Sequence, residues 1–176
     1  WKVLITAPYF QPIIDQFEAL FTSHGISPVV PEVNERMEEA DLIPLLPDID
    51  GVICGDDRFT ERALQSAPRL KVLSKWGTGI DSIDQEACKR IGIRICNTPN
   101  AFSEAVADSV IGYMLCFCRR LPWMDRAMRT GQWEKLPGRT LRECTVGVVG
   151  VGDVGKTVVR RAAGFPHSPA THGDPH

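Results

Sequence analysis

Three glycines near the end of the sequence have a spacing that could bind a phosphate. Gly150, Gly152 and Gly155 form the pattern G-x-G-x-x-G within "TVGVVGVGDVGKTVV". In this pattern the first glycine permits a tight turn, the second lets the backbone approach a pyrophosphate, and the third lets the following helix pack closely. Glycines also occur in strand-to-helix turns that bind nothing. Here an apolar run precedes the pattern and a helical run follows it, which favours a dinucleotide-binding site.

A second pair of glycines lies in "KWGTGIDSID", from Lys75 to Asp84. Gly77 and Gly79 would free backbone N–H groups at the end of a strand, and such groups form a concavity that binds anions. The carboxylate of a small substrate would suit it. Taken alone, the loop fits an ordinary glycine turn capped by Asp81 and Asp84 even better.

The cysteines and histidines do not have the spacing of a metal site. Six cysteines are scattered without a CxxC pair: Cys54, Cys88, Cys96, Cys116, Cys118 and Cys144. Two residues apart on a helix, Cys116 and Cys118 would point about 200° apart. His167, His172 and His176 lie in "PHSPATHGDPH", whose prolines and lack of large aliphatic residues are typical of an irregular tail. We therefore expect no metal ion, and free thiols in a reducing, cytoplasmic compartment.

Short β-rich runs alternate with helical segments through the first hundred residues. The runs cover residues 2–6, 27–31, 51–55, 71–75 and 93–97. Such alternation is typical of an α/β fold, with a parallel sheet and helices on both faces. Between the first two runs, a helix that ends at Gly25 would place four apolar residues on one face: Ile13, Phe17, Leu20 and Phe21. Residues 1–100 should form one five-stranded unit.

From Phe102 onward the sequence becomes helical. The stretch "FSEAVADSVIGYMLCFCRRL" has Ser103 as a possible N-cap and is apolar nearly all round, so another surface must cover it. A shorter helix, "PWMDRAMRTGQW", precedes a strand expected at 145–150. We therefore expect a second α/β unit over residues 101–165 and an irregular tail over 166–176.

The composition favours an enzyme or a binder of small ligands. The 176 residues are 43% hydrophobic and 24% charged, with a net charge of -2. Such a charge provides no field for nucleic acid or acidic membranes. No apolar run approaches the roughly 20 residues that cross a bilayer, and the first residues lack the layout of a signal peptide.

Three stretches, in this order, resemble the D-isomer-specific 2-hydroxyacid dehydrogenases, in particular the phosphoglycerate dehydrogenase group: "KVLSKWGTGIDSIDQEACKRIGIRICNTPNAFSEAVAD", "RTGQWEKLPGRTL" and "TVGVVGVGDVGK". The resemblance runs from about Val3 to Phe165. It implies a flavodoxin-like substrate domain at 1–100 and the first part of a Rossmann domain at 101–165. It also implies hydride transfer between a D-2-hydroxy acid and its 2-keto acid, NAD as cofactor with NADP not excluded, and a homodimer formed through residues 103–135.

The same resemblance implies which residues bind each partner. The substrate would contact Gly77, Thr78, Gly79 and Asn100. The cofactor would contact Thr78, Gly150, Gly152, Asp153, Val154, Gly155 and, at its ribose, Asp174. This last residue follows the glycine pattern at about the usual distance of ~20 residues, although no apolar strand precedes it.

The sequence departs from the family pattern at three places. Asp153 stands where a basic or neutral residue is usual, and its carboxylate would lie close to phosphate charge. Cys54 stands where phosphoglycerate enzymes often carry an arginine, which disfavours phosphoglycerate as substrate. The catalytic arginine, glutamate and histidine belong to segments "NxxRG", "DVxxxEP" and "PH", none of which is present. We therefore assign no catalytic residue and expect a truncated chain that is inactive alone. The alternative is an NAD-sensing adaptor of the corepressor type, or a non-catalytic binding fragment, with the same fold.

Overall fold

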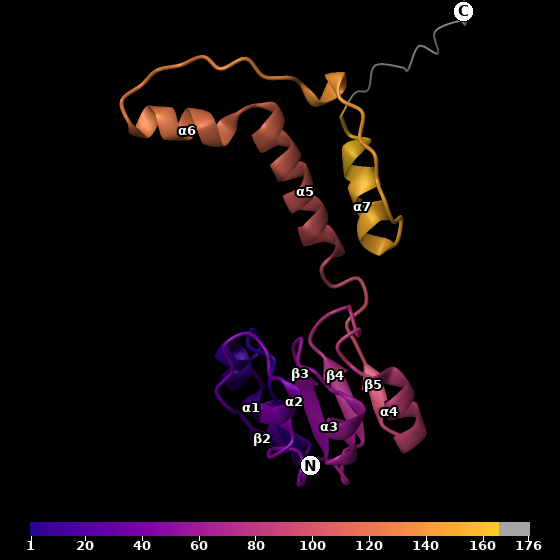
Figure 1. Cartoon of the computed structure of the whole chain (residues 1–176). Coiled ribbons are helices and arrows are strands. Elements are labelled where there is room, and N and C mark those ends of the chain that lie inside the picture. Colours follow the sequence, from indigo (N-terminus) through magenta and orange to yellow (C-terminus); the bar gives the residue numbers. More distant parts are fainter. Residues whose placement is uncertain (166–176) are drawn as a thin grey trace, which may run out of the picture. The chain divides into compact units, whose positions relative to one another are not determined.

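The computed structural model describes residues 1–165 and separates into two compact units, which divide between Ala101 and Phe102. The first unit is built around a β-sheet, and the second is helical (Figure 1). In the part of the chain that is described, no helix is both long and apolar enough to span a membrane.

The first unit contains one sheet of five parallel strands in the order β2-β1-β3-β4-β5 (Figure 1). The strands are β1 (Lys2–Ile5), β2 (Ser27–Val29), β3 (Gly51–Cys54), β4 (Val72–Lys75) and β5 (Arg94–Cys96). Each lies within one of the predicted runs, so the predicted five-stranded parallel sheet is confirmed. The strand order reverses between β1 and β3, and ligands of open α/β sheets bind beyond the carboxyl ends of the strands at such a point.

Successive residues of the strands face two separate cores, as helices on both faces require. On one face, Leu4 and Leu73 pack with residues of three helices, α2 (Glu39–Leu42), α3 (Glu61–Gln65) and α4 (Gln85–Ile91). On the other face, Val3 and Ile5 pack with Phe21 of helix α1 (Glu18–Ser23). The alternation follows from the period of two in a strand.

The segment between β1 and β2 differs from the single helix that was expected. It begins as a 3-10 helix, η1 (Gln11–Phe17), and only then becomes α1. The predicted stop is in place, since Gly25 has a left-handed φ of 62°. The predicted apolar face is wrong at Leu20, which is 52% exposed. The change from three to 3.6 residues per turn rotates this side chain away from the face that the others share.

The second unit consists of α5 (Ser103–Cys118), α6 (Leu121–Arg129), the short 3-10 helix η2 (Leu141–Glu143) and α7 (Asp153–Ala162). Helices α5 and α7 lie side by side (Figure 1). Ala107 and Ile111 of α5 and Val158 of α7 are buried. Arg161 of α7 pairs with Glu104 and Asp108 of α5. The predicted N-cap is wrong: Phe102 occupies that position, and Ser103 is the buried first residue of α5.

The strand expected at 145–150 does not form in the described structure. These residues have no assigned helix or strand, and Val149 is fully exposed. A strand needs a neighbour for its backbone N–H and C=O groups. Within residues 1–165 no segment pairs with this one, so the apolar run remains extended loop.

Candidate functional site

The glycine loop that follows β4 has two carbonyls that accept hydrogen bonds from the segment after β5. Thr98 donates its N–H to the carbonyl of Gly77 (2.9 Å), and the Asn97 side chain donates to the carbonyl of Thr78 (2.8 Å). The Thr78 hydroxyl donates in turn to the Thr98 carbonyl (3.1 Å). In residues 1–165 no hydrogen bond is donated by the backbone N–H of Thr78 or Gly79, and both residues are exposed. The loop carbonyls are occupied by hydrogen bonds and the N–H groups are free, which is the arrangement that binds an anion.

A buried cation lies beneath this loop. Lys75, the last residue of β4, is only 4% exposed, and its Nζ donates to the carbonyl of Gly55 (2.6 Å) and pairs with Asp56. A Cβ on Gly77 would lie 3.0 Å from the Lys75 Cε, so the glycine makes room for the lysine stem. No role was assigned to Lys75 from the sequence. The signal that could have identified it is a lysine at the end of an apolar strand, where a charged side chain needs a partner.

A buried carboxylate ties together the segments at the carboxyl end of the sheet. Asp57 is fully buried and accepts hydrogen bonds from the Thr6 hydroxyl (2.6 Å) and from the N–H groups of Met37 (2.7 Å) and Gly55 (3.0 Å). Thr6 follows β1 and Asp57 follows β3, so this junction lies where the strand order reverses. Sequence reasoning missed Asp57 as well.

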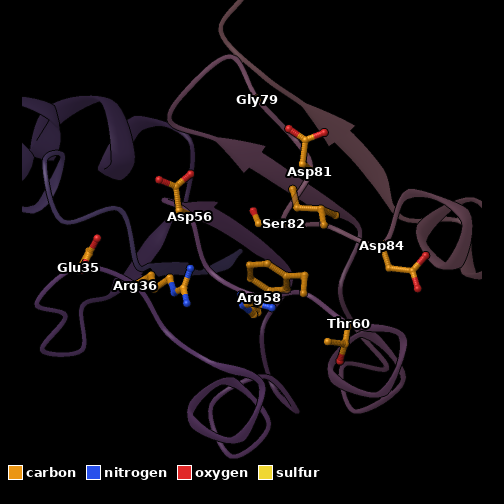
Figure 2. A pocket seen from close by; sticks show the side chains of 11 residues that line it. Glu35, Arg36, Asp56, Arg58, Thr60, Gly79, Asp81, Ser82 and Asp84 are labelled. Atoms are coloured by element: carbon orange, nitrogen blue, oxygen red, sulfur yellow. The ribbon is translucent and has the colours of Figure 1, made fainter.

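A cavity of about 610 Å³ opens next to the glycine loop (Figure 2). It is lined by Glu35, Arg36, Asp56, Arg58, Phe59, Thr60, Gly79, Asp81, Ser82, Ile83 and Asp84. Four of these side chains are acidic and two are basic, and both arginines pair with Glu38 (2.8 and 3.2 Å). The cavity is therefore negatively charged overall. Asp84 is the N-cap of α4 and accepts from the N–H of Ala87 (2.9 Å), so it caps the following helix and not the glycine turn.

Cys54 does not face this cavity. It is fully buried on β3, where its thiol donates to the carbonyl of Ser74 (3.7 Å). Burial, followed by the charge of Asp57, raises the pKa of Cys54 to about 12. The thiol is therefore neutral and cannot replace an arginine as an anion ligand.

Asn100, the fourth residue expected at the substrate, lies on an exposed turn with a left-handed φ of 62°. No hydrogen bond joins it to the glycine loop in residues 1–165. Thr98 of the same segment makes that contact instead. Its hydroxyl oxygen is buried without a hydrogen-bond partner among the described residues, as is that of Ser82 in the cavity wall.

In the second unit, the three glycines of the G-x-G-x-x-G pattern have the local geometry that each role requires. Gly150 has a left-handed φ of 85°, which a side chain would strain. A Cβ on Gly155 would lie far inside contact distance of the Gly150 carbonyl oxygen. Around Gly152 a Cβ would meet no atom within 4 Å, so the space in front of it is open.

Helix α7 begins directly at this turn. The Lys156 N–H donates to the Gly152 carbonyl (2.8 Å), which leaves the N–H groups of Asp153, Val154 and Gly155 as the unpaired first turn of a helix. Such N–H groups, together with the helix dipole, bind phosphate. The exposed carboxylate of Asp153 lies at the same end.

Several residues considered from the sequence lie outside the described residues: Asp174, His167, His172 and His176. Among residues 1–165, no group of three or more histidine, cysteine, aspartate or glutamate side chains could hold a metal ion.

Known proteins resemble the chain along most of its length. The family model described as "D-isomer specific 2-hydroxyacid dehydrogenase, catalytic domain" matches residues 3–167. A hydroxypyruvate reductase of Thermotoga maritima is 32% identical over 135 residues, which are 75% of this chain and 44% of that protein. A D-3-phosphoglycerate dehydrogenase of Homo sapiens is 34% identical over 134 residues, 74% of this chain and 25% of that protein.

Among solved structures, the NAD+-bound 3-phosphoglycerate dehydrogenase of Entamoeba histolytica is 27% identical with a TM-score of 0.74. The similarity covers 94% of this chain and 51% of that one. The chain therefore spans about half or less of the length of these relatives. Because the family model matches nearly the whole sequence, the chain belongs to the D-isomer-specific 2-hydroxyacid dehydrogenase family.

Proposed function

We propose that this chain supplies the substrate-binding loop and the first part of the NAD site of an oxidoreductase. The reaction would interconvert a small D-2-hydroxy acid and its 2-keto acid. The observation that carries this proposal is the glycine turn before α7. Gly150 has a left-handed φ, a Cβ on Gly155 would meet the Gly150 carbonyl, and the space over Gly152 is open. Family membership and the NAD+-bound relative support the choice of NAD.

NAD would lie with its pyrophosphate over Gly152, against the N–H groups of Asp153 and Val154. When bound, NAD supplies or accepts the hydride. The carboxylate of Asp153 would repel the pyrophosphate, so binding should be weak. Asp174 is our candidate for the contact with the ribose of NAD.

The substrate carboxylate would bind to the loop Gly77–Thr78–Gly79, with Asn100 as a further candidate contact. The free N–H groups of Thr78 and Gly79 are the donors. Lys75 beneath them is paired with Asp56 and supports the loop. Thr78 is also our candidate for contact with the nicotinamide.

We further propose that residues 1–100 act as the substrate domain and 101–165 as the start of the NAD domain, in a homodimer formed through 103–135. The six free cysteines fit a reducing, cytoplasmic location. The 176-residue chain by itself should bind without turnover, since the arginine, glutamate and histidine segments of the family are not in its sequence. Hydride transfer then lacks its proton partner.

Two measurements on the purified chain test this proposal. Titration with NADH, followed by cofactor fluorescence, should show weak binding that Gly152→Asp reduces at least tenfold and that the control Gly147→Ala leaves unchanged. NADH oxidation with hydroxypyruvate or 2-ketoglutarate should not exceed the buffer rate. Absence of NADH binding would refute the cofactor assignment. A rate above buffer that Gly152→Asp abolishes would refute the claim of binding without turnover.

A further inference from the structure

Two cysteine thiols of the second unit lie in contact. The Sγ atoms of Cys118, the last residue of α5, and Cys144, which follows η2, are 3.8 Å apart. A disulfide needs a separation of about 2.05 Å. The Cys144 thiol also donates to the carbonyl of Thr140 (3.5 Å), so rotation of this side chain away from that carbonyl would have to bring the two sulfurs together. The four other cysteines are free and have no such sulfur contact among the described residues.

The backbone around both cysteines is held in place, so their proximity is built into the fold. The Cys118 carbonyl accepts from the N–H of Arg139 (2.8 Å), and a Cβ on Gly138 would lie 2.5 Å from the same oxygen. The Cys144 N–H donates to the carbonyl of Leu141 (3.1 Å), a buried residue. The loop 137–144 therefore packs against the C-terminal end of α5.

A small reagent can reach Cys144, because one of the cavities beside it is lined in part by Pro137, Gly138 and Arg139, which lie outside the segment 103–135 proposed for the dimer. Both cysteines are half-buried and line two cavities, of about 440 and 510 Å³. The larger cavity also contains Arg120 and Arg139. Two guanidinium groups beside a thiol pair favour an oxidant that carries carboxylates.

We propose that Cys118 and Cys144 form a reversible disulfide by reaction with glutathione disulfide. The Cys144 thiolate attacks one sulfur of the oxidant, forms a mixed disulfide and releases one glutathione thiolate, which takes up the proton that Cys144 lost. The Cys118 thiolate then attacks the Cys144 sulfur, forms the protein disulfide and releases the second glutathione. Two protein thiols are oxidised, and one glutathione disulfide is reduced to two glutathione molecules.

Oxidation of Cys118 and Cys144 by glutathione disulfide should be slow near neutral pH. Loss of hydration and the contact with Cys118 raise the pKa of the Cys144 thiol, so little thiolate is present at pH 7. The oxidation rate should therefore rise steadily with pH above neutrality. The cross-link joins α5 to the residue before the apolar run 145–150, which opposes separation of these segments on unfolding. This inference does not depend on the proposed function.

The test uses the purified chain in buffers of fixed ratio of oxidised to reduced glutathione. Remaining thiols are alkylated, and tryptic peptides are analysed by mass spectrometry. We expect a peptide pair joined through Cys118 and Cys144, four alkylated cysteines, full reversal by dithiothreitol, and a thermal midpoint several degrees higher in the oxidised protein.

Three variants decide which cysteines react. Cys96 and Cys116 both share a tryptic peptide with Cys118. Cys116→Ser, the nearer of the two, is the matched control and should retain the cross-link. Cys118→Ser should lose it and keep a glutathione adduct on Cys144, and Cys144→Ser should also lose it. Failure of the wild-type chain to form the pair, loss of the pair in Cys116→Ser, or equal oxidation of all six cysteines would each overturn the proposal. Fragmentation of the linked wild-type peptides between Cys116 and Cys118 assigns the bridge even if a variant does not fold.

Discussion

Asp57 joins three segments at the carboxyl end of the sheet. Its buried carboxylate accepts from a hydroxyl and two backbone N–H groups that belong to three separate segments. Asp57→Ala leaves the N–H groups of Met37 and Gly55 without an acceptor. We expect a loss of about 3 kcal/mol in the free energy of unfolding, measured by urea denaturation and circular dichroism. The control Asp81→Ala, at an exposed carboxylate, should change it by less than about 0.5 kcal/mol. Equal effects of the two substitutions would show that the buried hydrogen bonds of Asp57 do not stabilise the fold more than an exposed carboxylate does.

The buried thiols of Cys54 and Cys88 should lower the free energy of unfolding as the pH becomes alkaline. Burial raises the pKa of Cys54 to about 12 and that of Cys88 to about 11, from 9.0. The stabilisation is therefore complete below pH 9, where thiols are protonated in both states. It declines as the pH rises from 9 toward the folded-state pKa values, about 11 for Cys88 and about 12 for Cys54. Over this range the thiols of the unfolded chain ionise while those of the folded chain stay protonated.

The free energy of unfolding should thus fall between pH 8.5 and about pH 10.5 by an amount on the order of 1–2 kcal/mol from Cys54. Urea denaturation of Cys54→Ala should show a shallower fall with pH than the wild type. Cys96→Ala, at a half-buried thiol, is the control and should keep the wild-type slope. An unchanged slope in Cys54→Ala would contradict this account.

At the scale of elements, the entry into α7 depends on Gly155. A methyl group there would meet the carbonyl oxygen of Gly150, and backbone atoms cannot swing aside as a flexible side chain can. Gly155→Ala should therefore separate the turn from the helix and lower the thermal midpoint by several degrees, followed by circular dichroism. Gly147→Ala is the matched control, because its added methyl meets no atom within 4 Å. It should leave the midpoint within about 1 °C of the wild type. If Gly155→Ala also leaves the thermal midpoint unchanged, the close approach of Gly155 to the Gly150 carbonyl does not fix the turn.

At the scale of the whole molecule, the helical unit exposes a broad apolar surface. Tyr113 and Phe117 of α5 are 68% and 65% exposed, and Trp123 and Met128 of α6 extend the surface. Phe117 and Trp123 already stack edge to face, with ring centroids 5.6 Å apart. Exposed apolar patches of this kind mark interaction surfaces, and we proposed a second copy of the chain as the partner.

The wild-type chain should therefore sediment as a dimer at micromolar concentration, and Phe117→Glu should shift it to monomer by placing a charge in the interface. Tyr9→Glu, at an exposed aromatic residue of the first unit, should not change the sedimentation coefficient. A wild-type chain that sediments only as monomer would remove the basis for the dimer.

The sequence by itself determined the features that depend on local conformation. The five apolar runs became the strands of a parallel sheet, because β-branched residues and alternation with helices favour that architecture wherever they occur. The glycines at 150 and 155 adopt the predicted turn because one requires a left-handed φ and the other an absent Cβ, both within a few residues. Family membership followed from the order of such short motifs.

Only the tertiary structure decided the features that depend on distant partners. It buried Lys75 and Asp57 beside the carboxyl end of the sheet, surrounded the adjacent cavity with acidic side chains, and brought Cys118 to Cys144. It also left residues 145–150 without the strand that their apolar pattern predicted. The physical reason is common to all four: burial, charge pairing and strand pairing are set by which segments meet in space, and no local pattern contains that information.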